Sequence, residues 1–198
     1  MAVFAPWREI IMAITRLRVA GYRSLRRCSV ELSRLTVVVG PNGCGKTNLY
    51  RAMLLLASAA RGEFARQIVG EGGMNSVLWA GPRRKGPVRL VLGAVSGELE
   101  YELVAGLPPP PPSLFSLDPM IKEESIVVQA GGRRSELLGR KNAFISARNA
   151  DGQRVKYPFA IEPWQTVLGE LSEPKQFPEI RAVREELEAW RFYHTFRS

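Results

Sequence analysis

Residues 35–60, LTVVVGPNGCGKTNLYRAMLLLASAA, contain the stretch that decides the fold. Within it, residues 40–47 have the spacing G-x-x-x-x-G-K-[ST], which is that of a P-loop. The β-branched run before it, residues 35–39, predicts a short buried strand. The run from Asn48 onward lacks Gly and Pro and is rich in Leu and Ala, which predicts a helix. Strand, glycine-rich turn and helix follow each other in the order that this motif requires.

The motif predicts a binding site for nucleotide phosphates. Its glycines let the backbone bend tightly, so that successive N–H groups point at one anion in front of a helix N-terminus. Lys46 can then reach the β- and γ-phosphates, and the hydroxyl of Thr47 can ligate Mg2+. The predicted phosphate-binding residues are Gly40, Pro41, Asn42, Gly43, Cys44, Gly45, Lys46 and Thr47.

Length and charge set broad limits. The chain has 198 residues, of which 45% are hydrophobic, and this is enough for one domain with a core. The net charge of +9 is uneven, because residues 1–66 carry eleven Lys or Arg against three Glu. Such an excess can attract polyphosphate, nucleic acid or an acidic partner. We favour an arginine-rich solvated surface, since every basic residue of that segment except Lys46 is arginine.

The cysteines and the N-terminus bear on compartment and domain organisation. Cys28 and Cys44 are too few for a disulfide scaffold, which predicts reduced thiols in a cytoplasmic protein. No apolar run approaches the roughly 18 residues of a membrane-spanning helix, so no membrane association is expected. Residues 1–11 lack the features of a signal peptide. We expect them to be an N-terminal extension that can be disordered, and residues 12–198 to form a single domain.

Two strands are predicted before the P-loop, because residues 14–22 and 25–32 alternate between apolar and polar side chains. A small kinase or a G protein usually starts with the P-loop strand, and the N-K-x-D motif of G proteins is absent from this sequence. After the P-loop, the patterns predict a helix over 48–61, a short helix over 64–69, a hairpin over 88–104, a strand over 124–130, a hairpin over 144–157, and helices over 162–171 and 179–190.

Four other patterns receive structural explanations. The three glutamates of residues 98–102 could suggest a metal site, but their strict alternation predicts one solvated strand face. The basic residues of the 81–87 stretch are expected in a solvated loop rather than against nucleic acid. The proline run 108–112 predicts a stiff connector. His194, the only histidine, is expected to pack or to face solvent rather than to catalyse.

Residues 14–56, ITRLRVAGYRSLRRCSVELSRLTVVVGPNGCGKTNLYRAMLLL, resemble the N-terminus of the SMC/RecF-like branch of ABC-type ATPases. That branch has a strand, a turn of the type F-[KR]-[SN]-[LF], a second strand and then G-P-N-G-x-G-K-[ST]-N. Here the turn is residues 22–25, YRSL, and Asn42 and Asn48 match the two asparagines. The later stretches EGGMNSVLWAGPR and WRFYHTFR are similar to segments of bacterial ATPases of the RecF/AAA type.

The resemblance implies a fold and a ligand. The fold would be α/β, a P-loop NTPase of the ABC/SMC head type, with a mixed sheet and an antiparallel β extension. The ligands would be ATP and Mg2+, with Thr47 at the metal. Asn42 would approach the γ-phosphate, and Asn48 and Arg23 would also lie at the nucleotide. The complete protein would form a homodimer.

The sequence lacks two motifs that the resembled ATPases need for hydrolysis. No run of four apolar residues followed by Asp-Glu is present, and the nearest candidate ends at Asp118 with Pro119 after it. No serine-containing signature of the Leu-Ser-Gly-Gly type is present either. We therefore expect the N-terminal part of a larger ATPase head, incomplete in this chain. The catalytic residues stay unassigned, and the sequence leaves open whether the chain by itself is an enzyme.

Two alternatives remain open at the level of sequence. One is a nucleotide-switched DNA-binding module in DNA repair or phage defence, which the basic residues 1–66 motivate. The other is an interaction domain with a degenerate P-loop that has no catalytic role. The intact Lys46 and Thr47 disfavour the second alternative.

Overall fold

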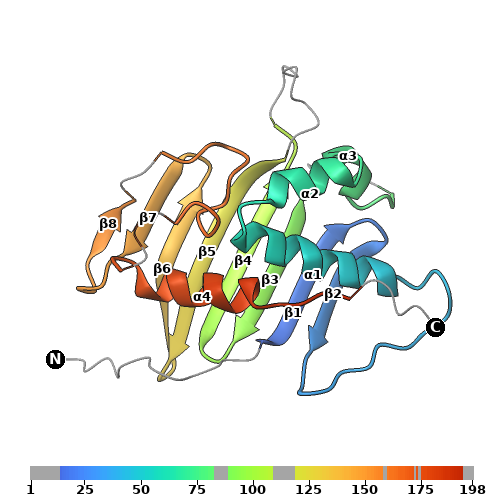
Figure 1. The fold of residues 1–198 in the computed structure, drawn as a ribbon, viewed down its shortest axis with the longest axis horizontal. Helices are drawn as coiled ribbons and strands as arrows, with labels where there is room; N and C mark the ends of the chain where they lie inside the picture. The colour runs from blue at the N-terminus through green and yellow to red at the C-terminus, as the bar shows by residue number, and fades with distance from the viewer. Residues whose placement is uncertain are drawn as a thin grey trace.

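The computed structural model describes residues 14–82, 89–108, 119–157, 160–171, 173 and 175–193. Within these ranges the chain forms an eight-stranded sheet and four helices (Figure 1). The predictions for residues 1–11, for most of the basic stretch 81–87, for most of the proline run 108–112 and for His194 lie outside the described residues.

The sheet is antiparallel throughout, and its strand order is β2-β1-β3-β4-β5-β6-β7-β8. The strands are β1 Ile14–Tyr22, β2 Leu25–Glu31, β3 Leu90–Ser96, β4 Leu99–Gly106, β5 Met120–Ala130, β6 Arg133–Lys141, β7 Phe144–Arg148 and β8 Arg154–Lys156. The helices are α1 Lys46–Ala60, α2 Phe64–Gly70, α3 Met74–Val77 and α4 Pro178–Glu188. Strand β1 pairs with both β2 and β3, so the P-loop and helices α1 to α3 lie in the chain between the two strands that flank β1.

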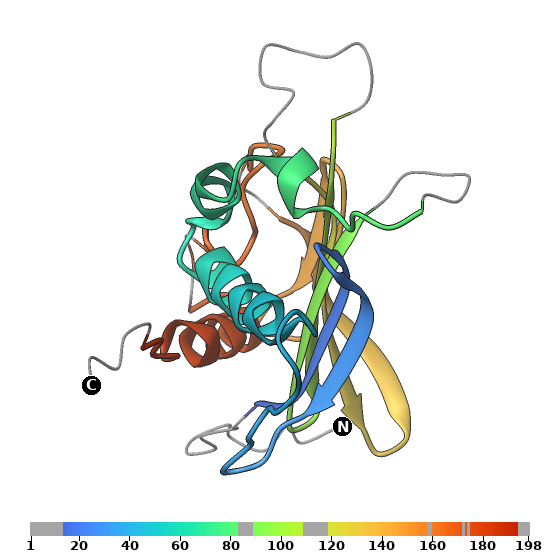
Figure 2. The same cartoon turned by 90° about the vertical axis from the view of Figure 1, so that its right-hand side faces the viewer.

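One face of the sheet carries the core. Helices α1, α2 and α4 lie on the same side of the sheet (Figure 2). Leu17 and Val19 of β1 are almost fully buried, whereas Arg16 is exposed, as the period of two requires. On the other face, Arg18 forms an ion pair with Glu100, which agrees with the prediction that the alternating glutamates occupy a surface strand face.

The predicted P-loop strand is wrong. Residues 35–39 form no strand, and the exposed fractions of Leu35, Val37 and Val39 are 81%, 72% and 82%. β-Branched residues favour extended backbone, but a strand also needs a neighbour to satisfy its N–H and C=O groups. Among the described strands none pairs with this run. The predicted mixed sheet is wrong for the same reason, since the run would have supplied its non-antiparallel strand.

Other predicted elements are confirmed with shifted ends: α1, α2, α4, the β3–β4 hairpin, β5 and the β7–β8 hairpin. Strand β6 and the short helix α3 were not predicted. Strand β6 is rich in charged residues, which hides its alternation, and it is held by pairing with both β5 and β7.

The predicted helix over 162–171 is wrong. The segment forms turns, and two of its N–H groups donate to a side chain of the sheet instead of to carbonyl groups of a helix. Val167 N and Leu168 N donate to the carboxylate of Glu124, at 2.7 and 3.2 Å. Thr166 Oγ1 donates to the carbonyl oxygen of Ala59 at 2.6 Å, which ties the segment to the end of α1.

Glu124 is at the centre of a buried polar network. Its side chain is fully buried and also accepts a hydrogen bond from the Tyr101 hydroxyl at 3.1 Å. Nη1 of Arg140, itself buried, lies 3.8 Å from Glu124 Oε2. Burial raises the pKa of Glu124, while the backbone donors and Arg140 act in the opposite direction. The network is fully inside the protein and holds the 160–171 segment to the sheet.

Candidate nucleotide-binding site

Helix α1 begins in front of a polar cleft. The helix has 15 residues, carries no acidic residue in its first turn and has no side-chain cap. Its first N–H groups therefore keep their capacity to bind an anion at the positive end of the helix. The cleft has a volume of about 240 Å3, and its lining residues are Ser24, Asn42, Gly43, Gly45, Lys46, Thr47 and Asn48.

The loop conformation depends on two glycines. Gly43 and Gly45 have φ angles of +83° and +104°, which side chains other than hydrogen disfavour. A Cβ on Gly45 would lie 3.0 Å from Leu25 Cδ2 and 3.2 Å from Ser24 Oγ. The loop therefore packs directly against the turn between β1 and β2, and only glycine fits at position 45.

Lys46 lies within the curve of its own loop. Its ammonium Nζ donates to the carbonyl oxygens of Gly40 at 2.6 Å and Pro41 at 2.9 Å, and lies 3.9 Å from Cys44 Sγ. These neutral acceptors are weaker than the oxygens of a phosphate, which would form charge-assisted hydrogen bonds. A phosphate bound in the cleft could therefore replace these carbonyl oxygens as the hydrogen-bond acceptor of Lys46.

Most of the predicted site residues come together. Six of them line the cleft, and Gly40 and Pro41 contact Lys46 through their carbonyl oxygens. Thr47 is among the lining residues, as its predicted role at Mg2+ requires. No carboxylate lines the cleft, and the described part of the chain holds no cluster of three or more His, Cys, Asp or Glu suited to a metal. The cleft therefore fits phosphates and leaves Thr47 as its one predicted metal ligand.

Ser24 belongs to the site although it was not predicted. Its Oγ accepts a hydrogen bond from Asn48 Nδ2 at 2.8 Å, so the β1–β2 turn is joined to the first turn of α1. The signal was present in the sequence, because Ser24 is the third residue of the YRSL turn. Only the folded chain shows that this turn forms a wall of the cleft.

Arg23 does not line the cleft, and its guanidinium is held by Glu71. Its Nη2 and Nε lie 2.7 and 3.0 Å from Glu71 Oε2, which also accepts from the Tyr22 hydroxyl at 2.7 Å. Burial raises the pKa of Tyr22, so its hydroxyl stays a donor. Arg23 has a φ of +46°, an uncommon value for a residue with a side chain.

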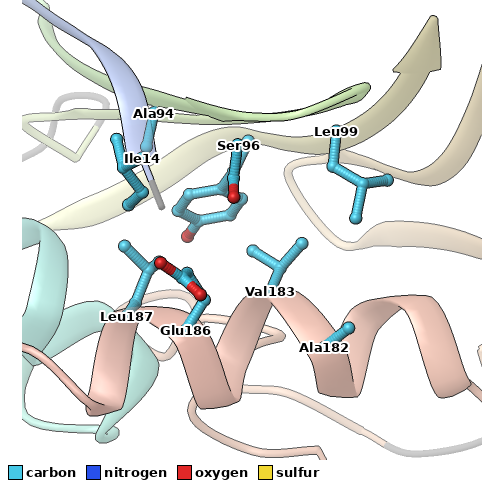
Figure 3. Close-up of a pocket in the computed structure, with 9 residues that line it drawn as sticks. Ile14, Ala94, Ser96, Leu99, Ala182, Val183, Glu186 and Leu187 are labelled. Carbon is cyan, nitrogen blue, oxygen red and sulfur yellow. The ribbon is translucent and has the colours of Figure 1, made fainter. Parts of the chain in front are cut away.

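Two apolar hollows lie elsewhere. A cavity of about 60 Å3 lies between α4 and strands β3 and β4, where Val183, Glu186 and Leu187 face Ala94 and Leu99 (Figure 3). Burial raises the pKa of Glu186. A larger groove of about 470 Å3 lies between residues 32–38, α1 and residues 190–192.

Comparison with known proteins finds a family match over the segment that contains the P-loop. Residues 12–91 match the family model described as the AAA ATPase domain. Chromosome partition protein Smc from Rhodopseudomonas palustris is 39% identical over 72 residues, which are 35% of this chain and 6% of the relative. A solved structure from work on ATP-driven dimerization and DNA-stimulated activation of SMC ATPases covers 88% of this chain and 99% of its own, at 15% identity and a TM-score of 0.31.

These matches concern the segment that contains the P-loop. Residues 12–91 are similar to the AAA ATPase domain. Together with the identity to Smc, this similarity confirms the SMC/RecF-like resemblance drawn from the sequence. The match to the curated Smc protein spans only a small part of that protein's length, and the TM-score is too low to bear on the fold. No helix among the described residues is long and apolar enough to cross a membrane.

Proposed function

We propose that this protein binds ATP with Mg2+ in the cleft at the start of α1. The observation that supports this most is the arrangement of an uncapped helix N-terminus, two glycines at positive φ and Lys46 around one polar hollow. Backbone N–H groups would hold the α- and β-phosphates, and Lys46 would exchange its carbonyl partners for the β- and γ-phosphates. Thr47 would hold Mg2+ through its hydroxyl.

Calorimetry with ATP and with ADP, each with Mg2+, tests this proposal. Lys46→Ala should abolish binding, because Lys46 is the one lysine among the described residues that line the cleft. Lys141→Ala is the matched control, since Lys141 is exposed on β6 and does not line this cleft. Equal affinities in the wild type and in Lys46→Ala would remove the P-loop from the proposal.

We also infer that this chain alone turns ATP over very slowly. Phosphoryl transfer depends on groups that orient water and stabilise charge, and their loss costs on the order of 10³-fold or more in rate. No carboxylate lines the cleft, and Glu162 is in the segment tied to β5 and β6. Steady-state phosphate release from the purified chain should be near background. Brisk turnover that Lys46→Ala abolishes would mean that an acid such as Glu162 or Asp118 is catalytic.

The missing groups would come from further ATPase segments, in this polypeptide or in a partner. Residues 35–39 support this, because an apolar β-branched run that is 48–82% exposed at its leucine and valines suits pairing with another strand. The 470 Å3 groove beside it, lined by Thr36 and Val38, would then be filled. The complete protein would be a homodimeric ATPase head. Adding a segment with a Walker B acid pair should restore turnover.

A DNA-binding module that nucleotide switches is the second candidate. Arg27, Arg34 and Arg51 are exposed and form no ion pair with a described acidic residue. They belong to the basic segment 1–66 and are available for phosphate contacts. DNA affinity that falls steeply with salt and depends on ATP would support this candidate. Affinity for DNA that is unchanged by nucleotide would count against a switch.

A further inference from the structure

A polar cluster surrounds Glu71 beside the turn between β1 and β2, and no part of the proposed chemistry uses this cluster. Glu71 follows α2, and its side chain is only 8% exposed. Its Oε2 accepts from Tyr22 and twice from Arg23, whereas its Oε1 is buried without a hydrogen-bond partner among the described residues. Burying a carboxylate costs free energy, particularly when one of its oxygens has no hydrogen-bond partner. Here the hydrogen bonds through which Glu71 holds Tyr22 and Arg23 offset that cost.

What Glu71 fixes is the turn between β1 and β2. Arg23 N donates to the Val77 carbonyl at 2.8 Å, and Ala80 N donates to the Arg23 carbonyl at 3.1 Å. The side chain of Arg23 is locked to Glu71 at the same time, although the backbone of Arg23 is left-handed. Left-handed backbone at a residue with a side chain persists only where its surroundings enforce it. Among the described residues, the Glu71 carboxylate is the charged partner that holds the Arg23 guanidinium.

The turn between β1 and β2 also forms a wall of the cleft at the start of α1. Ser24, directly after Arg23, lines the cleft and accepts from Asn48 of α1. A Cβ at Gly45 would be in tight contact with Ser24 and Leu25. A change in the conformation of Arg23 would therefore move Ser24 away from Gly45 and Asn48. A continuous series of contacts therefore runs from the end of α2 to the P-loop through Glu71, Arg23 and Ser24.

We propose that Glu71 is a positioning residue of the nucleotide site, which acts through Arg23 to hold Ser24 against the P-loop. Glu71 is not among the described residues that line the cleft. This inference rests on the proposed binding of ATP in the cleft. The resulting prediction is that removing Glu71 weakens ATP binding although no lining residue changes.

The test compares the Mg-ATP affinity of four proteins by calorimetry. Glu71→Ala should lower the affinity by about tenfold, as expected when one hydrogen-bonding wall of a site is misplaced. Glu71→Gln should retain most of the affinity, because an amide oxygen can still accept from Tyr22 and Arg23. Glu63→Ala is the matched control for the change in net charge. It removes an exposed acid at the start of α2 that pairs with Arg66 and should leave the affinity unchanged.

Hydrogen exchange provides a readout that a general loss of stability would not reproduce. In Glu71→Ala the amides of Arg23 and Ala80, which close the turn, should exchange faster, while those of β4 and β5 should keep their protection. An affinity of Glu71→Ala equal to that of Glu63→Ala would overturn the inference. So would a higher affinity, which would mean that Glu71 restrains Arg23 from the nucleotide. If Glu71→Ala does not fold, Glu71→Leu provides the same comparison, because it also removes the acceptor of Tyr22 and Arg23 while it fills the space of the side chain.

The failure of this inference and the failure of the proposed function are distinguishable. If the wild type does not bind ATP, the proposed function is wrong. If the wild type binds ATP, Lys46→Ala does not, and Glu71→Ala binds as well as the wild type, then only the role of Glu71 is wrong.

Discussion

Gly43 and Gly45 offer a matched pair for testing how the P-loop is held. Both have positive φ angles, so an alanine at either position adds backbone strain of about 1–2 kcal/mol. They differ in their surroundings. A Cβ at position 43 meets no atom within 4 Å, whereas one at position 45 meets Leu25 Cδ2 at 3.0 Å and Ser24 Oγ at 3.2 Å. Such overpacking adds about 1–3 kcal/mol.

We therefore expect Gly45→Ala to lower the free energy of unfolding by about 2–5 kcal/mol and Gly43→Ala by about 1–2 kcal/mol. Urea denaturation followed by circular dichroism measures both values, provided that the dependence on urea concentration is the same in each variant. ATP affinity should fall more in Gly45→Ala, because the added methyl group separates the loop from Ser24. Equal losses of stability in the two variants would refute the contact between the loop and the β1–β2 turn.

Three further predictions concern the rest of the chain. Glu124→Ala should cost about 3–5 kcal/mol in urea denaturation, because it leaves Arg140 buried without its carboxylate; a loss below about 1 kcal/mol would show that water replaces the carboxylate. Deleting residues 1–11 should shift the melting temperature little, and a loss of several degrees would show that this extension contributes to the core. Val37→Thr should leave the free energy of unfolding within about 0.5 kcal/mol of the wild type, since Val37 is 72% exposed, while reducing any pairing with an added ATPase segment.

The sequence of residues 40–47 was sufficient to locate the candidate site. Its glycines and its single lysine are adjacent in the chain, so their geometry is set by the local backbone. Helix α1 was predicted for the same reason, because its propensity and its apolar stripe are local. The hairpins β3–β4 and β7–β8 follow from alternation and from turns at residues 97 and 152.

Local patterns failed where the outcome depends on a distant partner. Residues 35–39 have the composition of a buried strand, yet burial needs a neighbouring strand, and none among those described pairs with them. Residues 162–171 have the composition of a helix, yet the carboxylate of Glu124 accepts the N–H groups of Val167 and Leu168. Strand β6 is charged and was not predicted, yet two neighbours hold it in the sheet.

The sequence by itself determined that the chain has a P-loop motif before a helix and that residues 14–56 resemble SMC/RecF-like ATPases. Only the tertiary structure decided which residues outside the motif reach the loop. Ser24 lies at the cleft, and Arg23 lies at Glu71, because the β1–β2 turn packs between Gly45 and the segment after α2. Arg23 and Glu71 are 48 residues apart along the chain, so no local sequence pattern could have predicted their contact. Packing of the folded chain alone brings those two groups together.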